Sequence, residues 1–174
     1  LLAMNTDGSP YLRMNRSMYI IGLAGLNELV RIHSGGELHE SARAMELGLK
    51  VVSFLKDEAA RLSGETGMTF VLEQSPAETT AYRFARLDLK YHSPAAGRFV
   101  RGDIAEGAIY YTNSTHLAVD ADVPAGRRVA AEGKFHPYLQ GEVITHLQLG
   151  PEHPAAAHIK RHGDGVRDIA FQVE

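Results

Sequence analysis

Residues 72–88 read LEQSPAETTAYRFARLD, and this stretch decides how the chain divides into strands and helices. It begins with the end of MTFVLEQ (68–74), whose β-branched, aromatic and aliphatic residues predict a strand. It continues into AETTAYRFARLDLKY (77–91), which predicts a helix. Because a strand that turns into a helix is the building unit of α/β proteins, the stretch favours an α/β fold.

The turn inside this stretch has the composition of a helix start. Ser75, Pro76, Ala77 and Glu78 fit a capping box, with serine at the N-cap, proline at the first helical position and glutamate at the third. In such a box the serine hydroxyl accepts a backbone N–H of the first turn. From the residues alone, this plain cap is the preferred interpretation.

The same turn could hold an anion such as a phosphate. A helix start leaves backbone N–H groups without partners and carries the positive end of the helix dipole. The N–H groups from Ala77 to Thr80 would donate, and the hydroxyls of Thr79 and Thr80 would assist. Glu78 counts against this alternative, because its carboxylate competes for the same site. The residues therefore leave a phosphate site as the second interpretation.

Hydrophobic spacing predicts further elements in the first half of the chain. The clearest helix is ESARAMELGLKVVSFLKDEAARLSGETG (40–67), with Ser41 as its N-cap and Gly64 or Gly67 at its end. Its apolar spacing predicts one buried face, made of Ala44, Leu47, Val51, Phe54, Leu55, Ala59 and Leu62. A strand at Met18–Leu23 precedes a short helix at Leu26–Ile32, which Gly35 and Gly36 end.

The second half of the chain is predicted to be mostly strand and loop. A loop rich in glycine, proline and alanine (93–108) leads to a strand AIYYTNSTHLAV (108–119) and a turn DADVPAGRRV (120–129). The remaining predictions are a strand at Glu142–Leu149, a helix at Ala155–Arg161 and a strand at Val166–Val173. This mixed order of strands and helices indicates an α/β architecture.

Composition excludes several classes of function. The net charge of −3 gives no reason to expect nucleic acid or an anionic membrane as a partner, and no apolar run approaches the roughly 18 residues of a membrane span. The chain has no cysteine, which excludes a disulfide, cysteine-ligated zinc and a thiol nucleophile, and is compatible with a cytoplasmic location. Because the chain begins at Leu1 and stops at Glu174 inside a predicted strand, we expect an internal piece of a longer protein.

Two other polar stretches are candidates for ligand contacts. In YYTNSTH (110–116), a strand would place alternate polar side chains on one face, and Asn113 could bind sugar hydroxyls if that face lines a pocket. A solvated face without a role is somewhat preferred. In GLNE (25–28), Asn27 and Glu28 follow a predicted strand, where polar side chains often face a site, although helix-start chemistry explains them equally well.

The nine histidines form no convincing metal motif. His158 and His162 are four residues apart near a predicted helix end and could share a metal. A solvated pair at a helix C-terminus is much the preferred interpretation. No metal site is therefore predicted.

Four motifs, taken in order, resemble the anaerobic (class III) ribonucleoside-triphosphate reductases, which are glycyl radical enzymes. The motifs are IGLAGLNELV (21–30), LEQSPAETTAYRFARLD (72–88), YYTNSTHL (110–117) and GEVITHLQL (141–149), and their order and spacing agree over roughly residues 10–150. The resemblance implies a ten-stranded α/β barrel, with this chain in the second half-barrel. It also implies that ribonucleoside triphosphates are reduced to deoxyribonucleoside triphosphates by glycyl and thiyl radical chemistry.

By this resemblance the turn at 75–80 matches the substrate-phosphate turn of the reductases, and a phosphate site becomes the preferred interpretation. The residues expected to bind substrate are Ser75, Ala77, Glu78, Thr79, Thr80, Asn113, Ser114 and Asn27. No catalytic residue is expected in this chain, because the family's radical-relay cysteine, zinc cysteines and glycyl radical loop have no counterpart in it.

The resemblance also implies cofactors and partners for a complete enzyme. The cofactors are a glycyl radical, a structural zinc and the effectors ATP and dATP. The partners are a ribonucleoside triphosphate substrate, the rest of the reductase chain in a homodimer, and a radical-SAM activating enzyme. The implied location is the cytoplasm, with neither nucleic acid nor membrane as a partner.

A second resemblance concerns PEHPAAAHIKRHGDGVRDIAFQVE (151–174), which is similar to the amino-terminal domain of 4-hydroxyphenylpyruvate dioxygenase. We therefore expect a reductase-like half-barrel segment at 1–150 and a helix-turn-strand of uncertain parentage at 151–174. Two alternatives stay open. One is a piece of an iron dioxygenase, although none of that enzyme's iron ligands carries over to this segment. The other is a structural piece without a ligand, whose unpaired strands would associate with a partner.

Overall fold

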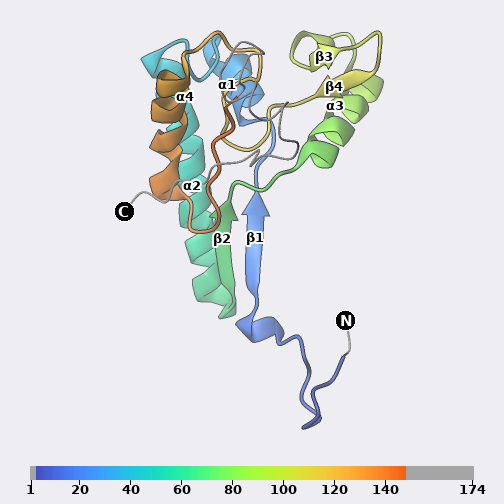
Figure 1. Cartoon of the computed structure of the whole chain (residues 1–174), viewed down its shortest axis with the longest axis vertical. Helices are drawn as coiled ribbons and strands as arrows, with labels where there is room; N and C mark the ends of the chain where they lie inside the picture. Colours follow the sequence, from blue (N-terminus) through green and yellow to red (C-terminus); the bar gives the residue numbers. More distant parts are fainter. Residues whose placement is uncertain (1–2, 148–174) are drawn as a thin grey trace, which may run out of the picture.

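The computed structural model describes residues 3–147 and shows a mixed arrangement of helices and strands (Figure 1). In chain order the elements are η1 (Met14–Arg16), β1 (Met18–Gly22), α1 (Leu26–Ser34), α2 (Ala42–Thr66), β2 (Thr69–Glu73), α3 (Glu78–His92), η2 (Ala96–Arg98), β3 (Arg101–Asp103), β4 (Ala108–Tyr110), α4 (Ala125–Glu132) and η3 (Gly133–Tyr138). The predicted α/β character is thus confirmed. In the described part, no helix is long and apolar enough to cross a membrane.

Strands β1 and β2 pair in parallel, from Met18 opposite Thr69 to Gly22 opposite Glu73. Helices α1 and α2 connect them, and α2 lies along β2 (Figure 1). A parallel pair needs such a crossover, because its strands run in the same direction. The strands predicted at 18–23 and 68–74 are both confirmed to within a residue.

Helix α2 begins and ends as its sequence predicts. The Ser41 hydroxyl accepts the Ala44 N–H at 3.1 Å, and Gly67 closes the helix in the left-handed conformation with φ of 68°. Its predicted buried face is only partly right. Ala44 and Ala59 are buried, but Phe54 is 61% exposed, because the most buried stripe is rotated towards Met45, Gly48 and Val52.

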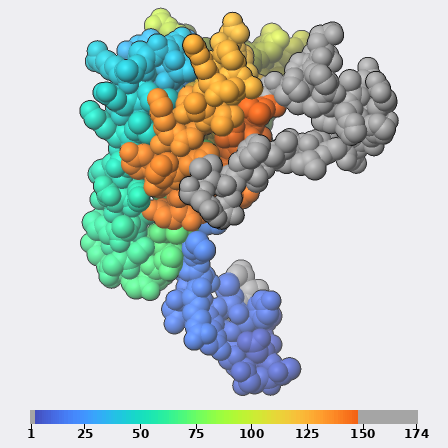
Figure 2. All heavy atoms as spheres, turned by 60° about the vertical axis from the view of Figure 1, so that its left-hand side comes forward, coloured from blue at the N-terminus to red at the C-terminus, as the bar shows by residue number. Residues whose placement is uncertain are grey.

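The hydrophobic core lies between α2, β2 and the α4–η3 segment. Its largest fully buried side chains include Phe135, Leu38 and Leu72. Gly48 allows the close approach, since a Cβ there would lie 2.5 Å from Cδ2 of Leu38 and 3.3 Å from Cζ of Phe135. Figure 2 shows the α4–η3 segment, in orange, lying against the cyan and teal surface of α2, with the blue N-terminal residues projecting from this body.

The strand predicted at Glu142–Leu149 is wrong over residues 142–147, and its last two residues lie outside the described range. The segment runs beside β2 but is held irregularly. The N–H groups of Gln140 and Gly141 both donate to the Leu72 carbonyl, at 3.1 and 2.9 Å. The side chain of Gln74, rather than its carbonyl, accepts the Ile144 N–H. A backbone bond from Gln74 N–H to the Glu142 carbonyl at 3.0 Å is followed by this side-chain bond, so no regular ladder forms over residues 142–147.

The strand predicted at 108–119 ends at Tyr110, where the short antiparallel pair β3–β4 stops. The chain then turns to meet the β1–α1 connection: Gly25 N–H donates to the Thr112 carbonyl at 2.8 Å, and Ser114 N–H donates to the Leu23 carbonyl at 3.1 Å. Ser114 has φ of 48°, which breaks a strand. The predicted loop at 93–108 contains η2 and β3, and the predicted turn at 120–129 contains the start of α4.

The described residues form two separate two-stranded sheets rather than a closed barrel. The predictions at Ala155–Arg161 and Val166–Val173 lie outside the described residues, as does the predicted division of the chain after residue 150.

Candidate functional site

A pocket of about 530 Å³ lies where α3 begins, beside β4 and α4; we call it the α3 pocket. It is lined by Glu78, Ala81 and Tyr82 of α3, by the run from Ile109 to Asn113, by His116, Leu117 and Val119, and by Arg128, Glu132 and His146. Four segments that are distant in sequence therefore share one cavity. Two predicted substrate residues, Glu78 and Asn113, are among them.

Helix α3 begins at Glu78, three residues after the predicted N-cap, so the predicted capping box is wrong. Its N-cap residue is Ala77, and no side chain caps the helix. The Ser75 hydroxyl instead donates to Glu73 Oε1 at 3.3 Å, back towards the strand end. The first backbone bond of the turn runs from Ala81 N–H to the Ala77 carbonyl at 2.7 Å, which leaves three N–H groups before it without helical partners.

The predicted residues of the turn divide between the pocket and the surface beside it. Glu78, the first residue of α3, lines the α3 pocket, whereas Ser75, Ala77, Thr79 and Thr80 belong to the same turn without lining it. Thr79 is exposed and Thr80 half-buried. A ligand in the pocket that extends past Glu78 would meet the uncapped start of the helix.

Asn113 enters the pocket from the opposite segment. Its backbone is fixed by an isolated bridge to Ala24. Its side-chain Oδ1 is buried and has no hydrogen-bond partner among the described residues. An unpaired buried amide oxygen is costly, so Asn113 has an acceptor that a ligand donor would satisfy.

Asn27 and Ser114 lie behind the pocket and do not line it. Asn27 is fully buried: its Nδ2 donates to Glu37 at 3.2 Å, and its Oδ1 accepts the Leu38 N–H at 3.1 Å. Ser114 is also fully buried, and its hydroxyl has no partner within residues 3–147. Asn27 thus ties the start of α1 to the α1–α2 loop, whereas Ser114 is joined to the β1–α1 connection through its backbone N–H.

A buried ionic network supports the pocket wall at Thr112. The Glu28 carboxylate accepts Arg101 Nε at 2.6 Å and both the hydroxyl and the N–H of Thr112. Arg101 also donates to Glu37, and to Asp120 at 2.9 Å. Burial acts to raise the pKa of Glu37, but hydrogen bonds from Arg101 and Asn27 outweigh it and hold the pKa below its usual value.

A second buried pair supports the other side of the pocket. Glu132 is fully buried and accepts the Leu117 N–H at 3.0 Å, while its other oxygen lies 3.4 Å from Nδ1 of His116. Arg128 donates to the carbonyls of Leu117 and Ala118, the latter at 2.9 Å. One turn of α4 thus fixes the backbone that follows His116.

Tyr111 forms a third part of the wall. Its hydroxyl donates to Asp88 of α3 at 2.8 Å. Burial, followed by the hydrogen bond to Asp88, raises the pKa of Tyr111 well above its usual value. The phenol therefore stays protonated and joins the pocket wall to α3.

Comparison with known proteins decides the family. The anaerobic ribonucleoside-triphosphate reductase family matches residues 5–166. The chain belongs to this family. It is 28% identical over 172 residues to the anaerobic ribonucleoside-triphosphate reductase of Salmonella typhimurium, covering 98% of this chain and 23% of that protein. The reductase of Escherichia coli is 27% identical over the same share of each chain. That of Enterobacteria phage T4 is 24% identical over 137 residues, 79% of this chain and 19% of the phage protein.

The reductase match also bears on the segment that resembles a dioxygenase. It continues to residue 166, inside 151–174, and the bacterial relatives align over 98% of the chain. A piece of an iron dioxygenase is therefore not supported. The chain spans about 23% of the length of these reductases.

Sequence reasoning missed the buried charges in and behind the wall of the α3 pocket. Arg101, Arg128 and Glu132 are each less than a tenth exposed, yet nothing in their neighbouring residues distinguishes them from surface charges. One signal was available: in GLNE, Glu28 follows a predicted strand, and its carboxylate lies at the centre of the network with Arg101. Its partners are 73 and 84 residues away along the chain.

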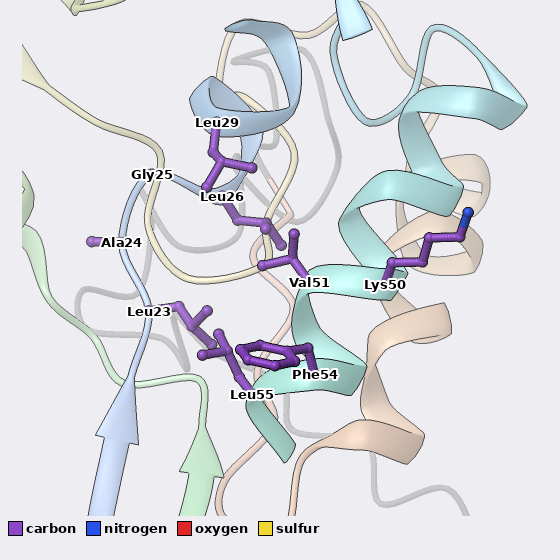
Figure 3. A pocket seen from close by; sticks show the side chains of 9 residues that line it. All are labelled: Leu23, Ala24, Gly25, Leu26, Leu29, Lys50, Val51, Phe54 and Leu55. Atoms are coloured by element: carbon purple, nitrogen blue, oxygen red, sulfur yellow. The ribbon is translucent and has the colours of Figure 1, made fainter. Parts of the chain in front are cut away.

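A second pocket, of about 500 Å³, is apolar and lies between the β1–α1 connection and α2. Figure 3 shows Leu26 facing Val51, and Leu23 near Phe54 and Leu55, while the Lys50 side chain points away from the others. No predicted site residue lines it. Within residues 3–147, no group of three or more His, Asp or Glu side chains is placed to hold a metal ion.

Proposed function

We propose that this chain supplies barrel wall and substrate-phosphate contacts to an anaerobic ribonucleoside-triphosphate reductase. The enzyme would reduce ribonucleoside triphosphates to deoxyribonucleoside triphosphates by glycyl and thiyl radical chemistry. Family membership supports the reaction. One structural observation carries the phosphate contact: α3 starts without a side-chain cap, and its first residue lines the pocket that contains Asn113.

The uncapped start of α3 suits a triphosphate for an electrostatic reason. The N–H groups of Glu78, Thr79 and Thr80 precede the first helical hydrogen bonds and point along the positive end of the helix dipole. A phosphate oxygen accepts such hydrogens readily. The Thr79 and Thr80 hydroxyls, with Ser75 and Ala77 in the preceding turn, would complete the contact. Asn113 would face the sugar with its free Oδ1, and Ser114 and Asn27 would support the substrate site from behind the pocket.

The wider assembly belongs to the same proposal. We propose that the chain forms part of the second half of a ten-stranded α/β barrel, with residues 1–150 as its segment. The glycyl radical, the structural zinc and the ATP or dATP effectors would be held outside the residues described here. Since residues 1–174 contain no cysteine, neither a thiyl radical nor a cysteine-ligated zinc is placed on them. A homodimer in the cytoplasm, activated by a radical-SAM enzyme, completes the proposal.

Titration calorimetry with CTP tests the phosphate contact. The double variant Thr79→Ala and Thr80→Ala is expected to bind about tenfold more weakly, because two hydroxyl donors to a charged acceptor are lost while the backbone N–H groups remain. The matched control is Thr6→Ala with Thr69→Ala, two exposed threonines away from the pocket, which should bind as the unaltered chain does. Equal affinity in both double variants would contradict the phosphate assignment and favour a structural piece without a ligand.

A change at Glu78 should affect CTP affinity in the opposite direction. Its carboxylate lies at the first position of α3 and lines the pocket, where it repels an entering triphosphate. Glu78→Gln removes this repulsion without changing the size of the side chain, so CTP affinity should increase. A decrease would show that the carboxylate orders the turn rather than opposing the ligand.

A further inference from the structure

The His116 ring lies in the wall of the α3 pocket with a buried carboxylate behind it. The residue is 8% exposed and lines the cavity. Its Nδ1 is 3.4 Å from Oε2 of Glu132, a residue that is fully buried. The other oxygen of that carboxylate is held by the Leu117 N–H at 3.0 Å and by Arg128 at 3.4 Å. Glu132 therefore has little freedom to move away from the ring.

A carboxylate at one ring nitrogen determines what the other can do. It favours the tautomer with hydrogen on Nδ1 and fixes the orientation of the ring. Within residues 3–147, the hydrogen bonds of the His116 ring involve Nδ1 alone. Nε2 is thus available to a ligand, as an acceptor when the ring is neutral and as a donor when it is protonated.

The charges around His116 come from several elements. Helix α4 contributes Glu132 and Arg128, which neutralise each other at 3.4 Å. His136 of η3 is close enough to interact electrostatically with His116, and burial lowers the His136 pKa so that it is neutral at pH 7. The His146 ring meets the His116 ring edge-on at a centroid distance of 5.1 Å. Glu78 lines the same cavity from α3. The Glu132 and Glu78 carboxylates thus lie near the His116 ring, and a bound phosphate would add further negative charge beside it.

We propose that His116 is a ligand-binding residue of the α3 pocket, whose imidazole, oriented by Glu132, donates Nε2–H to an anionic oxygen of the bound triphosphate. This rests on the proposed function of the α3 turn and adds a contact from the opposite wall. His116 and the helix start then hold the phosphate chain from two sides. Because the contact needs a protonated ring, it strengthens as the pH falls.

The test measures the affinity of the full chain for inorganic tripolyphosphate between pH 5.5 and 8.5, by titration calorimetry. The variant is His116→Gln, and the matched control is His92→Gln, an exposed histidine at the far end of α3. Tripolyphosphate itself titrates in this range, so the informative quantity is the affinity of the unaltered chain divided by that of the variant at each pH. This ratio is expected to be about tenfold at pH 5.5, the strength of one charge-assisted hydrogen bond, and to fall towards one at pH 8.5.

The proposal for His116 and the proposal for the α3 turn fail on different outcomes. A ratio for His116→Gln that does not change with pH would overturn the role of His116 and leave the α3 turn intact. A chain that binds no tripolyphosphate at any pH would overturn both. The ratio for His92→Gln should stay near one throughout.

A measurement on the unaltered chain covers the case in which His116→Gln does not fold. The ring proton signals of His116 are followed by NMR against pH, with and without tripolyphosphate. The midpoint of that titration is expected to move to higher pH by about one unit when ligand is bound, since a tenfold preference for the protonated ring corresponds to one pH unit. An unmoved midpoint in the presence of bound ligand would overturn the proposal.

Discussion

Arg101 of β3 donates its Nε hydrogen to Glu28 of α1 at 2.6 Å, and this buried bond joins the two halves of the described chain. The same guanidinium bonds to Glu37 and Asp120, so three carboxylates depend on one cation. Burial acts to lower the pKa of Arg101, but its hydrogen bonds to Glu28 and Glu37 raise it, and the charge is retained. Breaking such a pair leaves uncompensated charge in the interior.

The first prediction concerns this pair. Arg101→Met should lower the free energy of unfolding by about 3–5 kcal/mol, because Glu28 would remain buried without its cation. Arg61→Met is the control: its bonds to Glu58 and Glu65 are on the surface of α2, where ion pairs contribute little. Urea denaturation followed by circular dichroism compares the two. Similar midpoints for both variants would show that the buried network contributes no stability.

The second prediction distinguishes two serines that each precede a helix and were both predicted to cap it. Ser41→Ala should destabilise the chain by about 1 kcal/mol, because its hydroxyl caps α2. Ser75→Ala should leave α3 unaffected, because that hydroxyl bonds to Glu73 instead of the helix. Thermal denaturation of both variants checks the difference. If Ser75→Ala proved as destabilising as Ser41→Ala, the helix would begin earlier than the structure shows.

The third prediction uses two glycines of α2. Gly64→Ala should stabilise the chain by roughly 0.5–1 kcal/mol, since alanine favours a helix and a Cβ at this exposed position meets nothing within 4 Å. Gly48→Ala should lose this gain, because its Cβ would collide with Leu38 at 2.5 Å. Urea denaturation gives both values. Equal stabilisation by the two alanines would mean that Leu38 moves aside without cost.

The fourth prediction is a pH dependence. Burial, together with the charge of His116, lowers the pKa of His136, although Glu132 acts to raise it. Below the ordinary histidine pKa of about 6.5 the unfolded chain then binds more protons than the folded one, so the free energy of unfolding should rise between pH 5 and 7. His136→Gln should reduce this slope, and His92→Gln should retain it. The measurement is the free energy of unfolding at several pH values. An unchanged slope in His136→Gln would mean that other groups cause the pH dependence.

The elements predicted well from sequence are those whose signals are local. Ser41 and Gly67 are adjacent to the helix that they cap, and the apolar periods of β1 and β2 lie within each strand. Ser75 shows where this reasoning fails. Its sequence fits a capping box, but Glu73 competes for the same hydroxyl, and only the folded geometry decides between them.

The candidate site was predicted only in part for the same reason. The turn before α3 could be recognised because a helix start has a short sequence pattern. The strand at 108–119 was overextended because residues 112–114 bond to the distant β1–α1 connection rather than continuing the β3–β4 pair. The carboxylate of Glu132 was not distinguishable from a surface charge until Arg128 was placed beside it.

The parallel pairing of β1 with β2 has a consequence for the time course of folding. Residues 18 and 69 must meet before the sheet exists, so the chain between them has to close into a long loop, which is entropically unfavourable. Helix α2 needs only neighbouring residues and can form much sooner. We therefore expect α2 to form early and the pairing of β1 with β2 to be the slow final step of folding. Met18 and Ile20, exposed even in the final structure, would be open to contacts with other nascent chains throughout that interval.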